Sequence, residues 1–206
     1  MALPKSCRMP DLSHLETLLP NLFTAVLGAE GKFLTKRERC IVRVFATLTE
    51  KARISYYRAR ELLLAEIEEM KRTSEEIQKN GRYFYFVDFD YHMENCLNAV
   101  RRLYWLLDFV KGEHGGIRIN RTLKRRINAH RDKIANIRGA VEHLEKEIRK
   151  KDDVSPIMLM VSEDDKSVII AGYSLEFENL AQLLTDFHTM AKQWLDDFCR
   201  ELGQKR

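Results

Sequence analysis

The feature that most constrains the fold is an apolar stripe at helical spacing in the second half of the chain. Its members recur in alternating steps of four and three residues, which is the period of one face of an α-helix. The pattern predicts a long amphipathic helix that opens near Asn120 or Thr122 and packs its stripe into a helical bundle. The stripe consists of Leu123, Ile127, His130, Ile134, Ile137, Val141, Leu144 and Ile148.

Two helical segments are predicted near the N-terminus. Leu12–Leu27 is apolar at helical spacing but interrupted by Pro20, so we expect one short helix that is broken or kinked there. Thr35 and Glu38 then have the spacing of a capping box, in which each residue satisfies a backbone N–H of the other. They predict the start of a second helix.

That second helix runs from Lys36 towards Lys79 in the prediction. Its apolar stripe slips in phase near Ser55–Tyr57, which indicates a bend, and Asn80-Gly81 is a stop signal. The aromatic segment Tyr83–Val87 follows and is predicted to be extended. Apolar spacing over Asp90–Lys111 then predicts the next helix.

The last third of the chain changes character. Pro156–Val161 and Ser167–Tyr173 are short, partly β-branched runs that predict a β-hairpin, and Ser174 begins a last helix to about Leu202. The predicted fold class is mainly α, a helical bundle of about four to five helices with one β-hairpin before the last helix. We expect a single domain over residues 1–206, with an N-terminal helical segment (1–31), a bundle core (35–151) and a hairpin with the C-terminal helix (156–202).

Several features bound the class of protein. No apolar run approaches the roughly 18 residues that a membrane span needs, and the first residues lack the apolar stretch of a secretory signal. The four cysteines are far apart, without the spacing of a zinc site. We therefore expect a soluble, cytoplasmic protein with no membrane contact and no bound metal or cofactor.

The formal net charge of +4 conceals an asymmetry. Residues 117–151 hold twelve Lys or Arg against four acids, whereas residues 152–201 hold eleven acids against three bases. The contrast indicates either a nucleic-acid footprint or two elements that attract one another. Under the first interpretation, the candidate RNA-binding residues are Lys124, Arg125, Arg126 and Arg131.

A small-residue face lies on the basic helix. Arg138 and His143 are five residues apart, about 140° round a straight helix, and Ala135 and Gly139 lie between them. Such a face admits a phosphodiester or a partner helix. In the alternative interpretation, Arg138 pairs with Glu142 four residues on, and His143 is an ordinary surface residue.

The segment from Ile137 to Leu144, with Arg138 and His143, resembles the Arg-x4-His motif of the HEPN superfamily of helical bundle domains. The resemblance implies RNA binding, with Arg138 and His143 as catalytic residues of a metal-independent endoribonuclease. It also implies a homodimer with the two motifs facing one another through Ala135, Gly139 and Glu142. It further implies a role in a bacterial toxin–antitoxin or phage-defence system, with a protein partner such as an antitoxin. This chain has Gly139 where many active members have a polar residue.

The chemistry of these two residue types suits RNA cleavage. RNA is cleaved when its 2′-hydroxyl attacks the adjacent phosphorus, which requires a base near neutral pKa and a fixed positive charge. His143 suits the first role and Arg138 the second. The rival prediction is a non-catalytic helical module that docks onto a partner protein.

Other candidates have structural alternatives. His130 lies on the apolar stripe and is predicted to be a core histidine. Asp88, Asp90, His92 and Glu94 alternate as metal ligands would, but in a helix they scatter around it. The aromatic segment Tyr83–Phe86 either stacks on bases or packs in the core.

Overall fold

The structure is a computed structural model that describes residues 5–27, 34–113, 117–143, 149 and 158–203. Within these ranges the fold is mainly α, with seven helices and a three-stranded antiparallel sheet before the last helix. The predicted fold class is confirmed. Two predicted long helices are each divided into two, which gives more helices than the four to five expected.

The first helix is shorter than predicted. Helix α1 spans Leu19–Leu27, so Pro20 lies in its first turn, where a missing backbone N–H costs nothing. The preceding residues are not helical, although Leu12, Leu15 and Leu18 are buried. The apolar spacing of these leucines therefore reflects the burial of their side chains and not a helical backbone.

The helix predicted from Lys36 towards Lys79 is two helices. Helix α2 spans Lys36–Glu69 without a break at Ser55–Tyr57, and Thr35 and Glu38 form the predicted capping box. The chain then starts helix α3, Ser74–Asn80, with a second capping box between Thr73 and Glu76. Gly81 ends α3 at a φ of +71°, a conformation that glycine adopts without strain.

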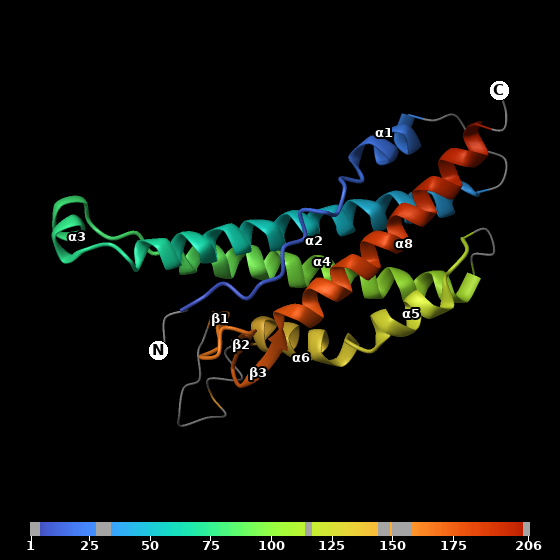
Figure 1. Cartoon of the computed structure of the whole chain (residues 1–206). Coiled ribbons are helices and arrows are strands. Elements are labelled where there is room, and N and C mark those ends of the chain that lie inside the picture. Colours follow the sequence, from blue (N-terminus) through green and yellow to red (C-terminus); the bar gives the residue numbers. More distant parts are fainter. Residues whose placement is uncertain (1–4, 28–33, 114–116, 144–148, 150–157, 204–206) are drawn as a thin grey trace.

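The two longest adjacent helices form the frame of the bundle. Helix α4 spans Phe86–Glu113 and runs beside α2, and Figure 1 shows α3 at the far end of this pair. Tyr83 and Phe84 precede α4 in irregular backbone and are exposed, whereas Phe86 is buried. The aromatic segment is thus divided between surface and core.

The predicted basic helix is two helices. Helix α5 spans Arg121–Asn128 and is capped by the Asn120 side chain, which accepts from two backbone N–H groups. Helix α6 spans Arg131–Glu142, after a break at Ala129 and His130. The apolar stripe is buried from Leu123 to Ile137 except at His130, while Leu144 and Ile148 lie outside the described residues.

The predicted hairpin is present and has a third strand. Strands β1 (Met160–Val161), β2 (Ser167–Ile170) and β3 (Tyr173–Glu176) pair in that order, all antiparallel. Ala171 and Gly172 connect β2 to β3 with positive φ values of 49° and 84°, as a type I′ turn requires. Ser174 therefore lies in a strand, and helix α8 begins three residues later, at Phe177, and ends at Gly203.

The core joins the helices through large aromatic side chains. Phe45 of α2 contacts Trp194 and Phe187 of α8, with ring centroids 4.4 and 5.9 Å apart, and Tyr104 of α4 lies 5.4 Å from Phe187. Figure 1 shows α8 crossing the α2–α4 pair. The apolar face of α8 is buried and consists of Leu180, Leu183, Leu184, Phe187, Ala191 and Leu195.

Candidate functional site

The end of α6 brings two arginines onto one carboxylate. Arg138 and Glu142 form an ion pair of 3.0 Å, as their i,i+4 spacing predicts. Arg101 of α4 donates a hydrogen bond to the other oxygen of Glu142. The carboxylate of Glu142 therefore bridges two guanidinium groups from two helices, and its side chain is 34% exposed.

The two carboxylates near Arg138, those of Glu142 and Glu94, have pKa values shifted in opposite directions. The hydrogen bond from Arg101, the charge of Arg138 and the proximity of His143 lower the pKa of Glu142. Burial and the nearby Asp90 raise the pKa of Glu94, while the charge of Arg138 opposes that rise. Arg138 therefore forms an ion pair with Glu142 and also attracts Glu94, and its Nε is buried with no hydrogen-bond partner in the described part of the chain.

His143 is exposed at the point where α6 ends. Its backbone leaves the helical conformation, with φ −123° and ψ 35°. The predicted angle of about 140° between Arg138 and His143 assumed a helix continuing to Ile148. Because the helix ends at Glu142, His143 lies beside the Arg138–Glu142 pair without a helical position of its own.

The small residues of α6 face open space. Ala135 is exposed, and a Cβ added to Gly139 would meet no atom within 4 Å apart from its chain neighbours and the backbone of its own helix. Gly139 is therefore not explained by close packing among the described residues of this chain. The surface at the middle of α6 is accessible to a phosphodiester or to another molecule.

Two of the four predicted RNA-binding residues are held by carboxylates. Arg126 donates hydrogen bonds of 3.0 and 2.5 Å to Asp186 of α8, which is buried. Arg131 donates bonds of 2.7 and 3.0 Å to Asp108 of α4. The Arg126–Asp186 pair joins the basic segment to the acidic segment. At Arg126, the charge asymmetry is therefore explained by attraction between two elements of the chain and not by a nucleic-acid footprint.

The remaining two differ in exposure. Lys124 is half-buried, with an interaction of its own, whereas Arg125 is exposed. The Arg125 side chain has no ion pair with any residue that the structure describes. Arg125 is thus the member of the basic run that is accessible to a phosphate.

His130 lies at the junction of α5 and α6 and is only partly buried. Burial, followed by the charge of Lys133, lowers the pKa of His130. The expected core position is therefore only partly attained, because the break between the helices turns this member of the stripe towards the surface.

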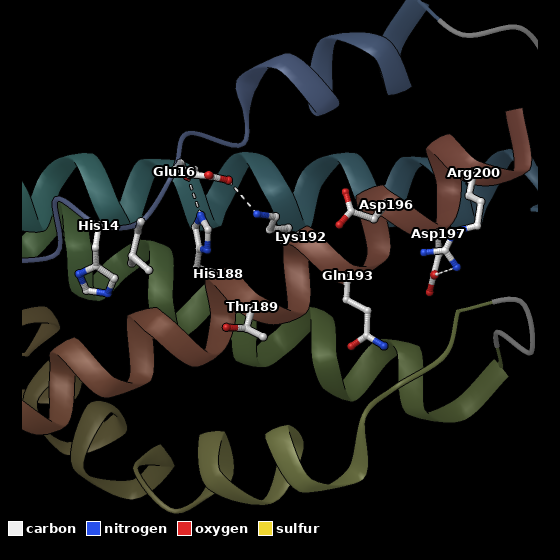
Figure 2. Close-up of a pocket in the computed structure, with 10 residues that line it drawn as sticks. His14, Glu16, His188, Thr189, Lys192, Gln193, Asp196, Asp197 and Arg200 are labelled. Atoms are coloured by element: carbon white, nitrogen blue, oxygen red, sulfur yellow. Dashed lines mark hydrogen bonds and ion pairs between the residues drawn. The ribbon is translucent and has the colours of Figure 1, made fainter. Parts of the chain in front are cut away.

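A hollow of about 730 Å³ lies elsewhere, between the N-terminal segment and α8 (Figure 2). The imidazole of His188 donates from Nε2 to the backbone oxygen of Glu16 at 2.7 Å, and the Glu16 carboxylate pairs with Lys192 at 2.7 Å. Asp197 pairs with Arg200 at 3.5 Å. The two contacts of Glu16 fasten the N-terminal segment onto α8, whereas the Asp197–Arg200 pair lies within α8. None of the residues predicted for a site lines this hollow.

Sequence reasoning did not identify Arg101 as a site residue. A signal was available, since Glu94, Arg101 and Asp108 recur every seven residues, or two helical turns, beside the apolar face of α4. All three lie on the side of α4 that meets α6. Charged residues at that spacing indicate contact with a second polar helix.

Over the described ranges, no group of three or more His, Cys, Asp or Glu side chains is placed to hold a metal ion. Among the helices that the structure describes, none is long and apolar enough to cross a membrane.

Comparison with known proteins adds no relative. No family model, no curated protein and no solved structure matches the chain.

Proposed function

We propose that this protein binds RNA as a HEPN-like helical domain, with a phosphodiester site formed by Arg101, Arg138 and His143. The observation that carries the proposal is the convergence of two guanidinium groups on one exposed carboxylate beside an exposed imidazole. Guanidinium groups bind carboxylates and phosphates through the same pairs of N–H donors. Glu142 thus occupies the position that a phosphodiester would take.

The exposure of Glu142 supports an exchange of anions at this site. Glu142 is the last residue of α6 and its side chain is 34% exposed, so a rotation into solvent would not disturb the core. A phosphodiester that replaced it would receive N–H donors from Arg101 and Arg138 and would lie next to His143. Glu142 therefore competes with RNA for the two arginines.

The same arrangement supports metal-independent cleavage as the activity of the bound state. His143 would take the proton of the 2′-hydroxyl as its oxygen forms a bond to phosphorus. The bond from phosphorus to the 5′-oxygen would break, and that oxygen would take a proton from water as it leaves. Arg138 and Arg101 would stabilise the additional negative charge, and the product would carry a 2′,3′-cyclic phosphate.

Binding of a fluorescein-labelled single-stranded RNA, followed by anisotropy, tests the site. Glu142→Gln should bind more tightly than wild type, because the amide no longer competes as an anion. Arg138→Ala and Arg101→Ala should each bind about tenfold or more weakly, the scale of one charge-assisted contact. Arg58→Ala removes an exposed arginine paired with Glu61 on α2 and serves as the matched control.

Unchanged binding in Arg138→Ala and Glu142→Gln would refute the site. Cleavage is measured on the same RNA in EDTA, where His143→Ala should lose about a hundredfold in rate. Equal cleavage by wild type and His143→Ala would mean a contaminating nuclease.

We also propose that two copies associate through α6, in the arrangement that the HEPN resemblance implies. Ala135 and Gly139 present backbone at an accessible surface, which allows a second helix to approach closely. A role in a toxin–antitoxin or phage-defence system, with an antitoxin as partner, belongs to the same proposal.

A second candidate function is protein docking. Apolar side chains are exposed at the far end of the α2–α4 pair, near α3, and exposed apolar clusters are typical of protein contact sites. If docking is the function, Phe84→Ser should abolish partner binding and leave RNA binding unchanged. The exposed side chains there are Met70, Tyr83, Phe84, Val87 and Tyr91.

A further inference from the structure

An exposed tryptophan lies one helical turn from the proposed phosphodiester site. Trp105 of α4 is 65% exposed, the highest value among the large hydrophobic side chains described, shared with Val87. Arg101 precedes it by four residues, so the two side chains are neighbours on the surface of the helix. A stacking surface and an anion-binding group therefore adjoin one another.

The ring of Trp105 is held in place by a short stack. It lies nearly parallel to Phe109, with centroids 5.7 Å apart and planes 17° apart. The guanidinium of Arg37 on α2 lies 4.6 Å from the centroid of the Phe109 ring. One face of the indole is thus supported by Phe109, and the side chain is exposed to solvent.

The surroundings of the stack are basic. Arg101 and Arg102 are exposed beside Trp105 on α4, and Arg37 lies at the end of the stack. The acids near these arginines are paired: Asp108 with Arg131, and Glu142 with Arg101 and Arg138. A surface of this kind is complementary to a polyanion that carries flat rings.

We infer that Trp105 stacks on an unpaired base of RNA, next to the phosphate held by Arg101 and Arg138. The inference rests on the proposed function and adds the form of the substrate, which is single-stranded RNA with an accessible base. One nucleotide joins its phosphate to its base through a single sugar, and one helical turn separates Arg101 from Trp105. Bases in a duplex are stacked on each other and do not present a free face, so a duplex should bind more weakly.

Tryptophan fluorescence of the 206-residue chain tests this inference, since its sequence has two tryptophans. Trp194 is buried against Phe45 and donates from Nε1 to the backbone oxygen of Arg118 at 2.9 Å, so it should not respond to ligand. A single-stranded oligoribonucleotide should quench the emission of wild type. The quenching should vanish in Trp105→Phe, which keeps an aromatic ring but leaves Trp194 as the only emitter.

Affinity separates stacking from apolar docking. Trp105→Leu keeps an exposed apolar side chain without a π face, and it should bind single-stranded RNA about tenfold or more weakly, whereas Trp105→Phe should stay close to wild type. Tyr91→Ala, another exposed aromatic of α4 fourteen residues away, is the matched control and should bind as wild type.

The outcomes distinguish this inference from the proposed function. If Arg138→Ala weakens RNA binding and Trp105→Leu does not, stacking is refuted and the phosphodiester site stands. If wild type binds no RNA, both are refuted. Emission of Trp105 that changes with protein concentration and not with RNA would make this face a contact between copies and overturn the inference.

Discussion

Replacing Gly139 by alanine should stabilise the folded chain. Gly139 lies inside α6, its φ is not positive, and the space where a Cβ would be added is open. Glycine in a helix interior costs about 1 kcal/mol relative to alanine. For a chain of about 200 residues, a gain of this size raises the unfolding midpoint by about 2–4 °C.

The assay is urea and thermal unfolding followed by circular dichroism at low micromolar concentration. Ala135→Gly is the matched control, because Ala135 is an exposed residue of the same helix, and this change should cost about 1 kcal/mol. A destabilised Gly139→Ala beside a normal Ala135→Gly would refute the reasoning. It would mean that another part of the protein packs on Gly139.

The same position tests the proposed homodimer. Gly139→Leu meets open space within the described chain, so the monomer should remain folded. Across a close helix contact, the larger side chain should weaken association by about 1–3 kcal/mol. Light scattering that shows wild type as a monomer at tens of micromolar, or a Gly139→Leu dimer as tight as wild type, would refute association through α6.

Two further predictions concern charge. Arg125→Ala should reduce the slope of log affinity for single-stranded RNA against log salt concentration by about 0.7. Arg126→Ala should instead lower the unfolding midpoint, because it leaves buried Asp186 without its ion pair. Equal effects of the two variants on the salt dependence would contradict this division. Burial lowers the pKa of His188 below its ordinary value of 6.5, so the unfolded chain takes up a proton that the folded chain does not. The contribution of His188 to the free energy of unfolding should therefore be complete above pH 6.5 and decrease as pH falls below it. In His188→Gln, whose amide can also donate to Glu16, urea unfolding at a series of pH values should show a smaller decrease.

Local signals predicted much of the fold. The capping box at Thr35 and Glu38, the cap at Asn120 and the stop at Asn80-Gly81 all depend on residues within a few positions of one another. The second capping box, at Thr73 and Glu76, was an equally local signal, and it marks an interruption that the prediction of one helix towards Lys79 did not include.

The missed features depend on tertiary structure or lack a local signal. The break at Ala129 and His130 contains neither glycine nor proline, and the apolar stripe continues across it. Ala171 adopts a positive φ in the turn before β3, where the usual asparagine or aspartate would have indicated a hairpin.

The candidate site was predictable only within α6. The Arg138–Glu142 pair follows from helical spacing, and the structure contains it. The contact of Arg101 with Glu142 joins residues 41 apart, so it depends on how α4 and α6 pack. The pairing of the basic residues likewise depends on tertiary structure, because Arg126 pairs with Asp186 of α8 and Arg131 with Asp108 of α4.

The way in which the α2–α4 pair is closed has a consequence for the order of folding. At the end of α2, the buried carboxylate of Glu66 accepts a backbone hydrogen bond from Tyr85, only 19 residues away. By contrast, His188 meets Glu16 across 172 residues, and Asn21 meets Asp196 across 175. Closing a short loop costs less chain entropy than closing a long one, and local contacts form sooner. We therefore expect α2, α3 and α4 to assemble first as a helical hairpin, and the N-terminal segment to dock onto α8 last and to leave first when the protein unfolds.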